Sequence, residues 1–190
     1  MNTELCKIDK FLRDNGFSPE TYQSMSEDTS GNPLVFDSAS EAFNFDEIIK
    51  NMFVSRPSSM DSLLLKDSLY FIEFKNGYPN AKKKTKTKLI TQSLKLKLSE
   101  SLIVLHELLL KQSNASKSFR VIAIIVLNSG FFPLTATVGV LGGLSGFNSC
   151  PSTSPFYKYR EASLVGTNCF YDDVQIWNEC NFSSRIKMLV

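Results

Sequence analysis

Asp61, Glu73 and Lys75 stand at the edges of a strongly apolar stretch of the chain. If this stretch folds back on itself, the two carboxylates face each other, with Cβ atoms roughly 4.5–5.5 Å apart, and like charges so placed repel. A divalent cation between the carboxylates would remove that repulsion, because Mg²⁺ is held in proteins by one or two carboxylates together with water and phosphate oxygens.

A β-hairpin is the element that would bring these side chains together. Ser62–Leu65 and Leu69–Lys75 are rich in strand-forming residues, and the polar segment Lys66–Ser68 between them is typical of a turn. This loop pairs Leu65 with Leu69 and sets Asp61 opposite Glu73, on the same face as Lys75. Both faces of the hairpin carry large apolar side chains, namely Leu63, Leu65, Leu69 and Phe71 on one and Leu64, Tyr70, Ile72 and Phe74 on the other.

A structural role for the three charges is the alternative. Glu and Lys two residues apart often form a solvated strand edge, and Asp61 can simply start a strand. However, a strand pair that is buried on both faces has little room for charges without a role. The hairpin therefore favours a functional site.

The order of an aspartate and, twelve residues later, Glu-x-Lys resembles the PD-(D/E)xK phosphodiesterase superfamily, the restriction-endonuclease-like nucleases. The resemblance implies that Asp61, Glu73 and the backbone carbonyl of Phe74 bind Mg²⁺ or Mn²⁺, and that Lys75 orients the attacking water. Met60 stands where many members of this superfamily have proline.

Two flanking helices would complete such a site. Ala39–Val54 is predicted to be helical, with a capping box formed by Ser38 and Glu41. The superfamily often adds a glutamate from this helix, and Glu47 is the candidate because Glu41 is explained by capping.

Leu89–Lys111 is predicted to form a long helix, with Ser93, Lys97 and Ser101 four residues apart on one polar stripe. Lys97 is its candidate site residue. The β-branched run Phe119–Leu127 predicts a buried parallel strand.

The predicted fold is therefore α/β, a restriction-endonuclease-like core of order α-β-β-α-β with a mixed central sheet flanked by helices. This core covers about residues 39–127 of a single domain, 1–190. About residues 1–34 form an N-terminal helical extension, with a helix at Asn2–Asn15 and a mixed, polar segment over 17–34 in which 26–33 are predicted to be an exposed loop. About residues 156–190 add a strand, Cys169–Trp177, and a terminal helix capped by Asn178, with Ile186 and Leu189 facing inward.

A lysine run follows the hairpin and carries no acid. Such runs are usually solvated, but here the run is a candidate for neutralising nucleic-acid phosphates, in DNA rather than RNA by the habit of the superfamily. Its members are Lys82, Lys83, Lys84, Lys86 and Lys88.

The histidine and cysteine content argues against two other kinds of site. One histidine and four cysteines without CxxC spacing argue against a zinc site or a histidine triad, and they fit the cytoplasm. Val121–Leu144 is uncharged and apolar, but glycines and Pro133 interrupt it, so a buried strand is favoured over a membrane segment. The Gly-rich residues 128–155 fit an ordered flap or a homodimer contact.

The leading hypothesis is a Mg²⁺-dependent nuclease acting on DNA, possibly on RNA. The alternative is a catalytically inactive protein of the same fold that binds nucleic acid or another protein, of the defence or toxin–antitoxin type. A membrane-associated protein is a third hypothesis. Metal-dependent cleavage of DNA distinguishes the first from the other two.

Overall fold

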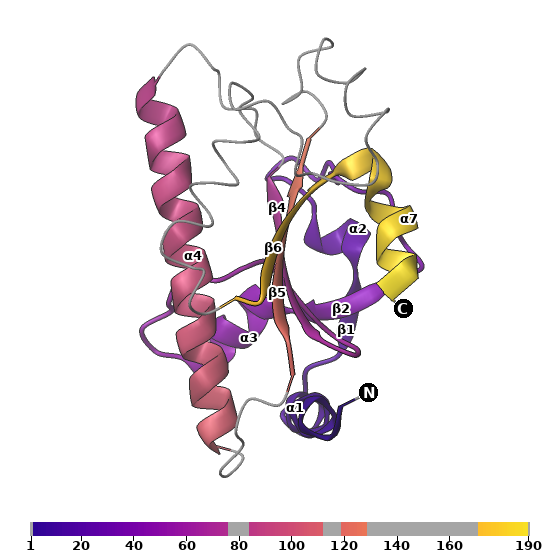
Figure 1. The fold of residues 1–190 in the computed structure, drawn as a ribbon, viewed down its shortest axis with the longest axis vertical. Coiled ribbons are helices and arrows are strands. Elements are labelled where there is room, and N and C mark those ends of the chain that lie inside the picture. The colour runs from indigo at the N-terminus through magenta and orange to yellow at the C-terminus, as the bar shows by residue number, and fades with distance from the viewer. Residues whose placement is uncertain (1, 76–83, 112–118, 129–170, 190) are drawn as a thin grey trace.

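The computed structural model describes residues 2–75, 84–111, 119–128 and 171–189. They form a six-stranded sheet in the order β1-β2-β3-β4-β5-β6, with helices on both faces (Figure 1). The strands are β1 Pro19–Thr21, β2 Glu41–Asn44, β3 Ser62–Leu65, β4 Leu69–Lys75, β5 Val121–Leu127 and β6 Asp173–Asn178. The helices are α1 Thr3–Asp14, α2 Tyr22–Met25, α3 Phe45–Met52, α4 Lys84–Lys111 and α7 Glu179–Leu189.

The sheet is mixed, as predicted. Strands β1 to β4 pair antiparallel, whereas β4, β5 and β6 run parallel to one another. A parallel pair needs a long crossover, and the segment between β4 and β5 contains α4. All seven residues of β5 are buried, which explains its unbroken apolar sequence. The α/β class with a mixed sheet between helices is therefore confirmed.

The core consists of two clusters, one on each face of the sheet. Alternate side chains of β3, β4 and β5 point to opposite faces. The first cluster joins α1, α3 and α4 to Leu63, Phe71 and Ile125, and the second joins α2 and α7 to Leu64 and Ile72. The odd-numbered residues of β4, including Glu73 and Lys75, thus belong to the α4 face.

The predicted hairpin is confirmed in its bounds and in its register. Leu65 pairs with Leu69, and the ladder runs to Ser62 and Ile72. Lys66 donates its N–H to the Ser68 carbonyl across the turn, at 3.1 Å. Strand β4 continues to Lys75, three residues beyond its last pair with β3, while it remains paired with β5. Residues 73–75 of β4 are therefore paired with β5 on one side but not with β3 on the other.

The prediction of one helix over Ala39–Val54 is wrong at its start. Glu41–Asn44 forms strand β2, because Ala42 and Phe43 are buried on opposite faces of the sheet, in the two-residue alternation of a strand. Helix α3 starts at Phe45, and its N-cap is Asn44, which accepts the N–H of Glu47 at 3.1 Å. The Ser38–Glu41 capping box does not form.

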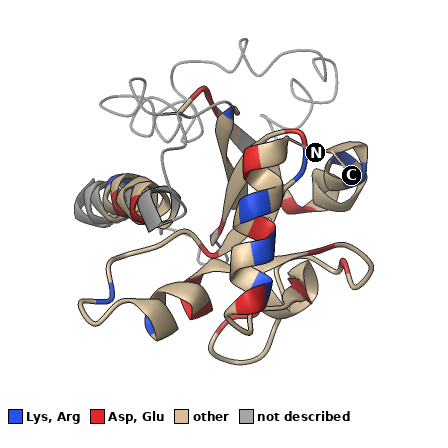
Figure 2. Cartoon of the chain, turned by 90° about the horizontal axis from the view of Figure 1, so that it is seen from below, with Lys and Arg blue, Asp and Glu red and all other residues tan. Residues whose placement is uncertain are grey.

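The loop predicted over 26–33 is confirmed, whereas residues 17–25 before it form elements that the sequence did not predict. They contain β1, which pairs with β2, and the one-turn helix α2, whose Tyr22 is fully buried. The predicted helix at Asn2–Asn15 is confirmed as α1. Its outer face alternates acids and bases, and these pair within the helix, as between Arg13 and Asp9 at 2.9 Å (Figure 2).

The last predicted elements are confirmed with shifted bounds. Helix α4 starts at Lys84, five residues before the predicted Leu89, and β6 covers the second half of the predicted strand. Asn178 caps α7 by accepting the Cys180 N–H at 2.6 Å, and Ile186 is buried. None of the helices in the described ranges is both long and apolar enough to cross a membrane.

Asp37 holds the turn that leads into β2, and its removal is expected to destabilise the protein. This buried carboxylate accepts the N–H groups of Ala39 at 3.1 Å and Ser40 at 2.9 Å. Asp37→Ala leaves both donors without this partner, and we expect the free energy of unfolding to fall by about 1–3 kcal/mol in urea titrations at pH 7.

The stability lost in Asp37→Ala should also depend on pH. Burial acts to raise the pKa of Asp37, but the hydrogen bonds from Ser40 and Ala39 outweigh it and lower this pKa below its ordinary value. A carboxyl with a lowered pKa stabilises the fold fully above its unfolded pKa, about 4, and loses that contribution as the pH falls through the folded value. The difference between wild type and variant should therefore shrink below about pH 4. A difference that is constant with pH would contradict this role of the Asp37 charge.

Candidate active site

Asp61 and Glu73 converge at the end of the hairpin where β3 begins and β4 ends. Phe45, the first residue of α3, donates its N–H to the Asp61 carbonyl at 3.0 Å and fixes the backbone there. The Asp61 side chain then reaches across to β4, where its Oδ2 accepts the N–H of Phe74 at 2.6 Å. The predicted proximity of Asp61 to Glu73 follows directly from the register of the hairpin.

Lys97 of α4 lies between the two carboxylates. Its Nζ donates to Asp61 Oδ1 at 3.0 Å and to a carboxylate oxygen of Glu73 at 2.9 Å. Lys75 donates to the other side of the same cluster, at Glu73 Oε1. The structure thus brings together four of the predicted residues, Asp61, Glu73, Lys75 and Lys97, with two negative and two positive charges.

The cluster is removed from water to an unusual extent for charged groups. The Glu73 side chain is 1% exposed, while Asp61, Lys75 and Lys97 keep 19–21% exposure. Burial, and then the charge of Glu73, raise the pKa of Asp61 to about 7. Burial acts to lower the pKa of Lys97, but Glu73 and Asp61 outweigh it and raise that pKa above its ordinary value.

Burying two ion pairs is a poor way to stabilise a fold, because the loss of hydration offsets most of the attraction between the charges. Apolar side chains of similar volume would stabilise this part of the core at least as well. Strongly perturbed ionisable groups gathered in one place are typical of functional sites. The energetics therefore favour a chemical role for the cluster over a structural one.

The backbone carbonyl of Phe74 faces the same edge as Asp61. In a strand, the N–H and C=O of one residue point to the same side, and successive residues alternate. Lys75 directs its carbonyl toward β5, where it accepts the N–H of Asn128 at 3.4 Å, so Phe74 directs its own groups away from β5. The hydrogen bond from the Phe74 N–H to Asp61 agrees with this direction.

The donor set fits a hard divalent cation. Two carboxylates that contact the same ammonium, and a backbone carbonyl on the edge of β4 that Asp61 contacts, are oxygen ligands of the kind that Mg²⁺ and Mn²⁺ prefer. A cation already lies between the carboxylates, because the Lys97 ammonium contacts both of them. Its four-carbon stem is flexible, so Lys97 can withdraw when a metal enters. Among the described residues, no group of three or more His, Cys, Asp and Glu side chains suits a metal ion, so the carbonyl would be needed as a third ligand.

Helix α4 also holds the segment that leads into Asp61. The buried Ser101 hydroxyl accepts the Met60 N–H at 2.9 Å, and the Glu100 carboxylate accepts the Ser58 N–H. Ser101 and Lys97 belong to the polar stripe that the sequence predicts on this helix. This polar stripe is therefore the face of α4 that contacts the residues just before β3.

The structure does not bring Glu47 into this cluster. Glu47 pairs with Lys50 at 2.9 Å, its side chain is 46% exposed, and no described contact joins it to Asp61 or Glu73. The neighbouring carboxylate of α3, Asp46, accepts the hydroxyl of Ser59, two residues before Asp61 in the chain. Sequence reasoning missed this contact, because a separation of thirteen residues between Asp46 and Ser59 follows no helix or strand spacing.

The lysine run lies partly outside the described residues. Lys82 and Lys83 fall in the undescribed segment 76–83, and the Gly-rich residues 129–155 fall in another. Lys84, Lys86 and Lys88 lie in the first turns of α4, but their side chains are not described. The predicted role of these lysines in binding phosphates therefore stays a prediction.

Comparison of the chain with protein-family models, with curated protein sequences and with solved structures finds no match. The chemistry of the cluster has to be judged from its own geometry.

Proposed function

We propose that the protein is a metal-dependent nuclease of the restriction-endonuclease-like type, with DNA as its substrate. The observation that carries the proposal is the convergence of Asp61, Glu73, Lys75 and Lys97 at the open end of β4. Ligands of open α/β sheets bind beyond the carboxyl ends of parallel strands, and Glu73 and Lys75 lie at that end of β4.

Each residue has a role that follows from its position. Asp61, Glu73 and the Phe74 carbonyl hold Mg²⁺ or Mn²⁺, which supplies Lewis-acid polarisation of the phosphate and a water of lowered pKa. Lys75 Nζ holds the attacking water beside Glu73 and stabilises the negative charge that develops on the phosphoryl oxygens. As the water oxygen bonds to phosphorus, the bond to the leaving sugar oxygen breaks; the water gives its proton to bulk solvent, and the leaving oxygen takes one from bulk solvent.

Lys97 acts as a counter-ion in this proposal. Without metal, its ammonium neutralises both carboxylates, and with metal bound it is free to turn toward the substrate phosphate. In this proposal Glu47 has no part in the site. Asp46, the neighbouring carboxylate of α3, is not a metal ligand; it contacts Ser59 and so holds the segment that leads to Asp61.

The direct test is cleavage of supercoiled plasmid, circular single-stranded DNA and RNA with Mg²⁺ or Mn²⁺, compared with EDTA. We expect metal-dependent cleavage of DNA, with loss of activity in EDTA and recovery when excess metal is added. Binding to DNA that weakens steeply with salt but never leads to cleavage would instead favour the inactive binding protein.

Replacing Lys97 separates a metal site from a structural ion-pair network. Lys97→Met removes the cation that lies between the two carboxylates and leaves only Lys75, on Glu73, as their partner among the described contacts, so we expect the free energy of unfolding in EDTA to fall by about 3 kcal/mol. Mn²⁺ should restore most of this loss, because the metal replaces the missing charge and stabilises only the folded state. Thermal unfolding with and without Mn²⁺ measures both effects. Destabilisation that Mn²⁺ leaves unchanged would contradict the metal site.

A further inference from the structure

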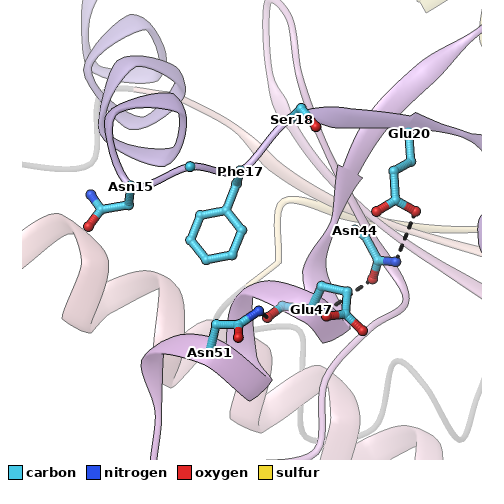
Figure 3. Close-up of a pocket in the computed structure, with 8 residues that line it drawn as sticks. Asn15, Phe17, Ser18, Glu20, Asn44, Glu47 and Asn51 are labelled. Atoms are coloured by element: carbon cyan, nitrogen blue, oxygen red, sulfur yellow. Dashed lines mark hydrogen bonds between the residues drawn. The ribbon is translucent and has the colours of Figure 1, made fainter.

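A polar cavity of about 400 Å³ is lined by none of the residues of the proposed nuclease site. It opens between the end of α1, the start of β1 and the first turns of α3 (Figure 3). Three asparagines, two glutamates and Phe17 line it. The ring of Phe17 lies between Asn15 on one side and Glu47 and Asn51 on the other (Figure 3).

The side-chain amides of this cavity have fixed orientations. Asn15 Nδ2 donates to the Phe11 carbonyl at 2.8 Å, and Asn51 Nδ2 donates to the Glu47 carbonyl at 2.9 Å. A carbonyl accepts only from a donor, so the amide nitrogens must occupy these positions. The side-chain oxygens of Asn15 and Asn51 are then left as acceptors, without a partner in the described part of the chain.

Asn44 orients one carboxylate of the cavity and the start of α3. Its Nδ2 donates to Glu20 Oε2 at 3.2 Å, while its Oδ1 accepts the Glu47 N–H. One oxygen of Glu20 and one of Glu47 remain without a partner among the described residues. The cavity therefore offers three acceptor oxygens, on Asn51, Glu20 and Glu47, whereas the Asn15 amide points away from the Phe17 ring (Figure 3).

The charge of the cavity is negative. Glu20 and Glu47 contribute two negative charges, and Lys50, which pairs with Glu47, contributes one positive charge. A phosphate or carboxylate ligand would be repelled. The volume exceeds that of a bare metal ion, and an aromatic ring beside carboxylates suits an organic cation, which gains a cation–π contact as well as hydrogen bonds.

We infer that this cavity binds a small organic cation that carries several N–H donors, a guanidinium or a primary ammonium. The donors meet the oxygens of Asn51, Glu20 and Glu47, and the flat cation lies against the Phe17 ring. Lys50 competes with the ligand for Glu47. This binding is independent of the nuclease activity.

Titration calorimetry of the full chain with agmatine, which has both cationic groups, tests the inference. We expect saturable binding that weakens with salt, at least about tenfold weaker in Glu47→Gln and in Glu20→Gln, because each removes a charged acceptor. Lys50→Met should bind agmatine more tightly, because it frees Glu47. Glu107→Gln makes the same charge change at an exposed site on α4 and should bind as the wild type does.

A capped arginine dipeptide identifies the source of the cation. Binding of agmatine alone indicates a free metabolite, and binding of both indicates that a protein-borne arginine fits too; either result supports the guanidinium chemistry. No binding of either compound, or weaker binding in Lys50→Met, would overturn the inference. So would agmatine binding that Glu73→Gln abolishes, since the ligand would then occupy the nuclease site.

Discussion

Glu73→Gln is expected to reduce metal-dependent DNA cleavage by about a thousandfold or more. Glutamine keeps the shape of the side chain but removes the charge that binds the metal and pairs with Lys75 and Lys97. The side chain of Glu73 is 1% exposed, so water cannot take the place of the missing carboxylate as a ligand or as a partner of the two lysines. Initial rates of plasmid nicking at saturating Mg²⁺ measure the effect.

The matched control is Glu107→Gln, which removes a carboxylate on the exposed side of α4. It should cleave at the wild-type rate. Circular dichroism and urea unfolding establish that Glu73→Gln is folded, and DNA binding in EDTA establishes that it still reaches the substrate. A folded Glu73→Gln protein that cleaves within a few fold of wild type would remove Glu73 from the active site.

Lys75→Ala is expected to reduce the rate of cleavage by about 10²–10³-fold while leaving metal binding intact. In the proposed mechanism Lys75 contacts the water and the developing charge on phosphate, not the metal. The effect should therefore appear in single-turnover rates at saturating metal, and Lys75→Arg should recover part of the activity by keeping the positive charge.

Lys66→Ala is the control on the same hairpin, because Lys66 lies in the turn at the opposite end from Lys75. It should leave cleavage unchanged. If Lys75→Ala weakens Mn²⁺ binding as strongly as it slows cleavage, Lys75 acts by supporting Glu73 rather than in the chemical step. Full activity in Lys75→Ala would remove Lys75 from the mechanism.

The part of the site that lies on the hairpin could be predicted because its geometry is local. A turn at Lys66–Ser68 fixes the register of β3 and β4, and the register alone places Asp61 near Glu73. Lys97 lies 36 residues from Asp61 in the sequence, and it was predicted as a candidate from its polar stripe on a leucine-rich helix together with the resemblance to the superfamily. The strand β5 could be predicted because its seven residues are all apolar and all buried.

The errors occurred where distant partners decide the structure. Residues 41–44 form a strand because Phe43 pairs with Leu63 on one side and with Pro19 on the other, and neither partner is visible in the local sequence. The same pairing moves the start of α3 from Ala39 to Phe45. The contact of Asp46 with Ser59 depends on how residues 53–59 return to the sheet, which no spacing rule determines.

The most direct test of the metal site is the anomalous scattering of Mn²⁺ in crystals of the wild-type protein, at a concentration that saturates binding in solution. We predict one peak about 2.1 Å from oxygens of both Asp61 and Glu73, with Lys97 Nζ displaced from its position between them. The Phe74 carbonyl should complete the protein ligands. If Lys97 still bridges the two carboxylates and Mn²⁺ lies elsewhere, the cluster is an ion-pair network and the nuclease proposal is wrong.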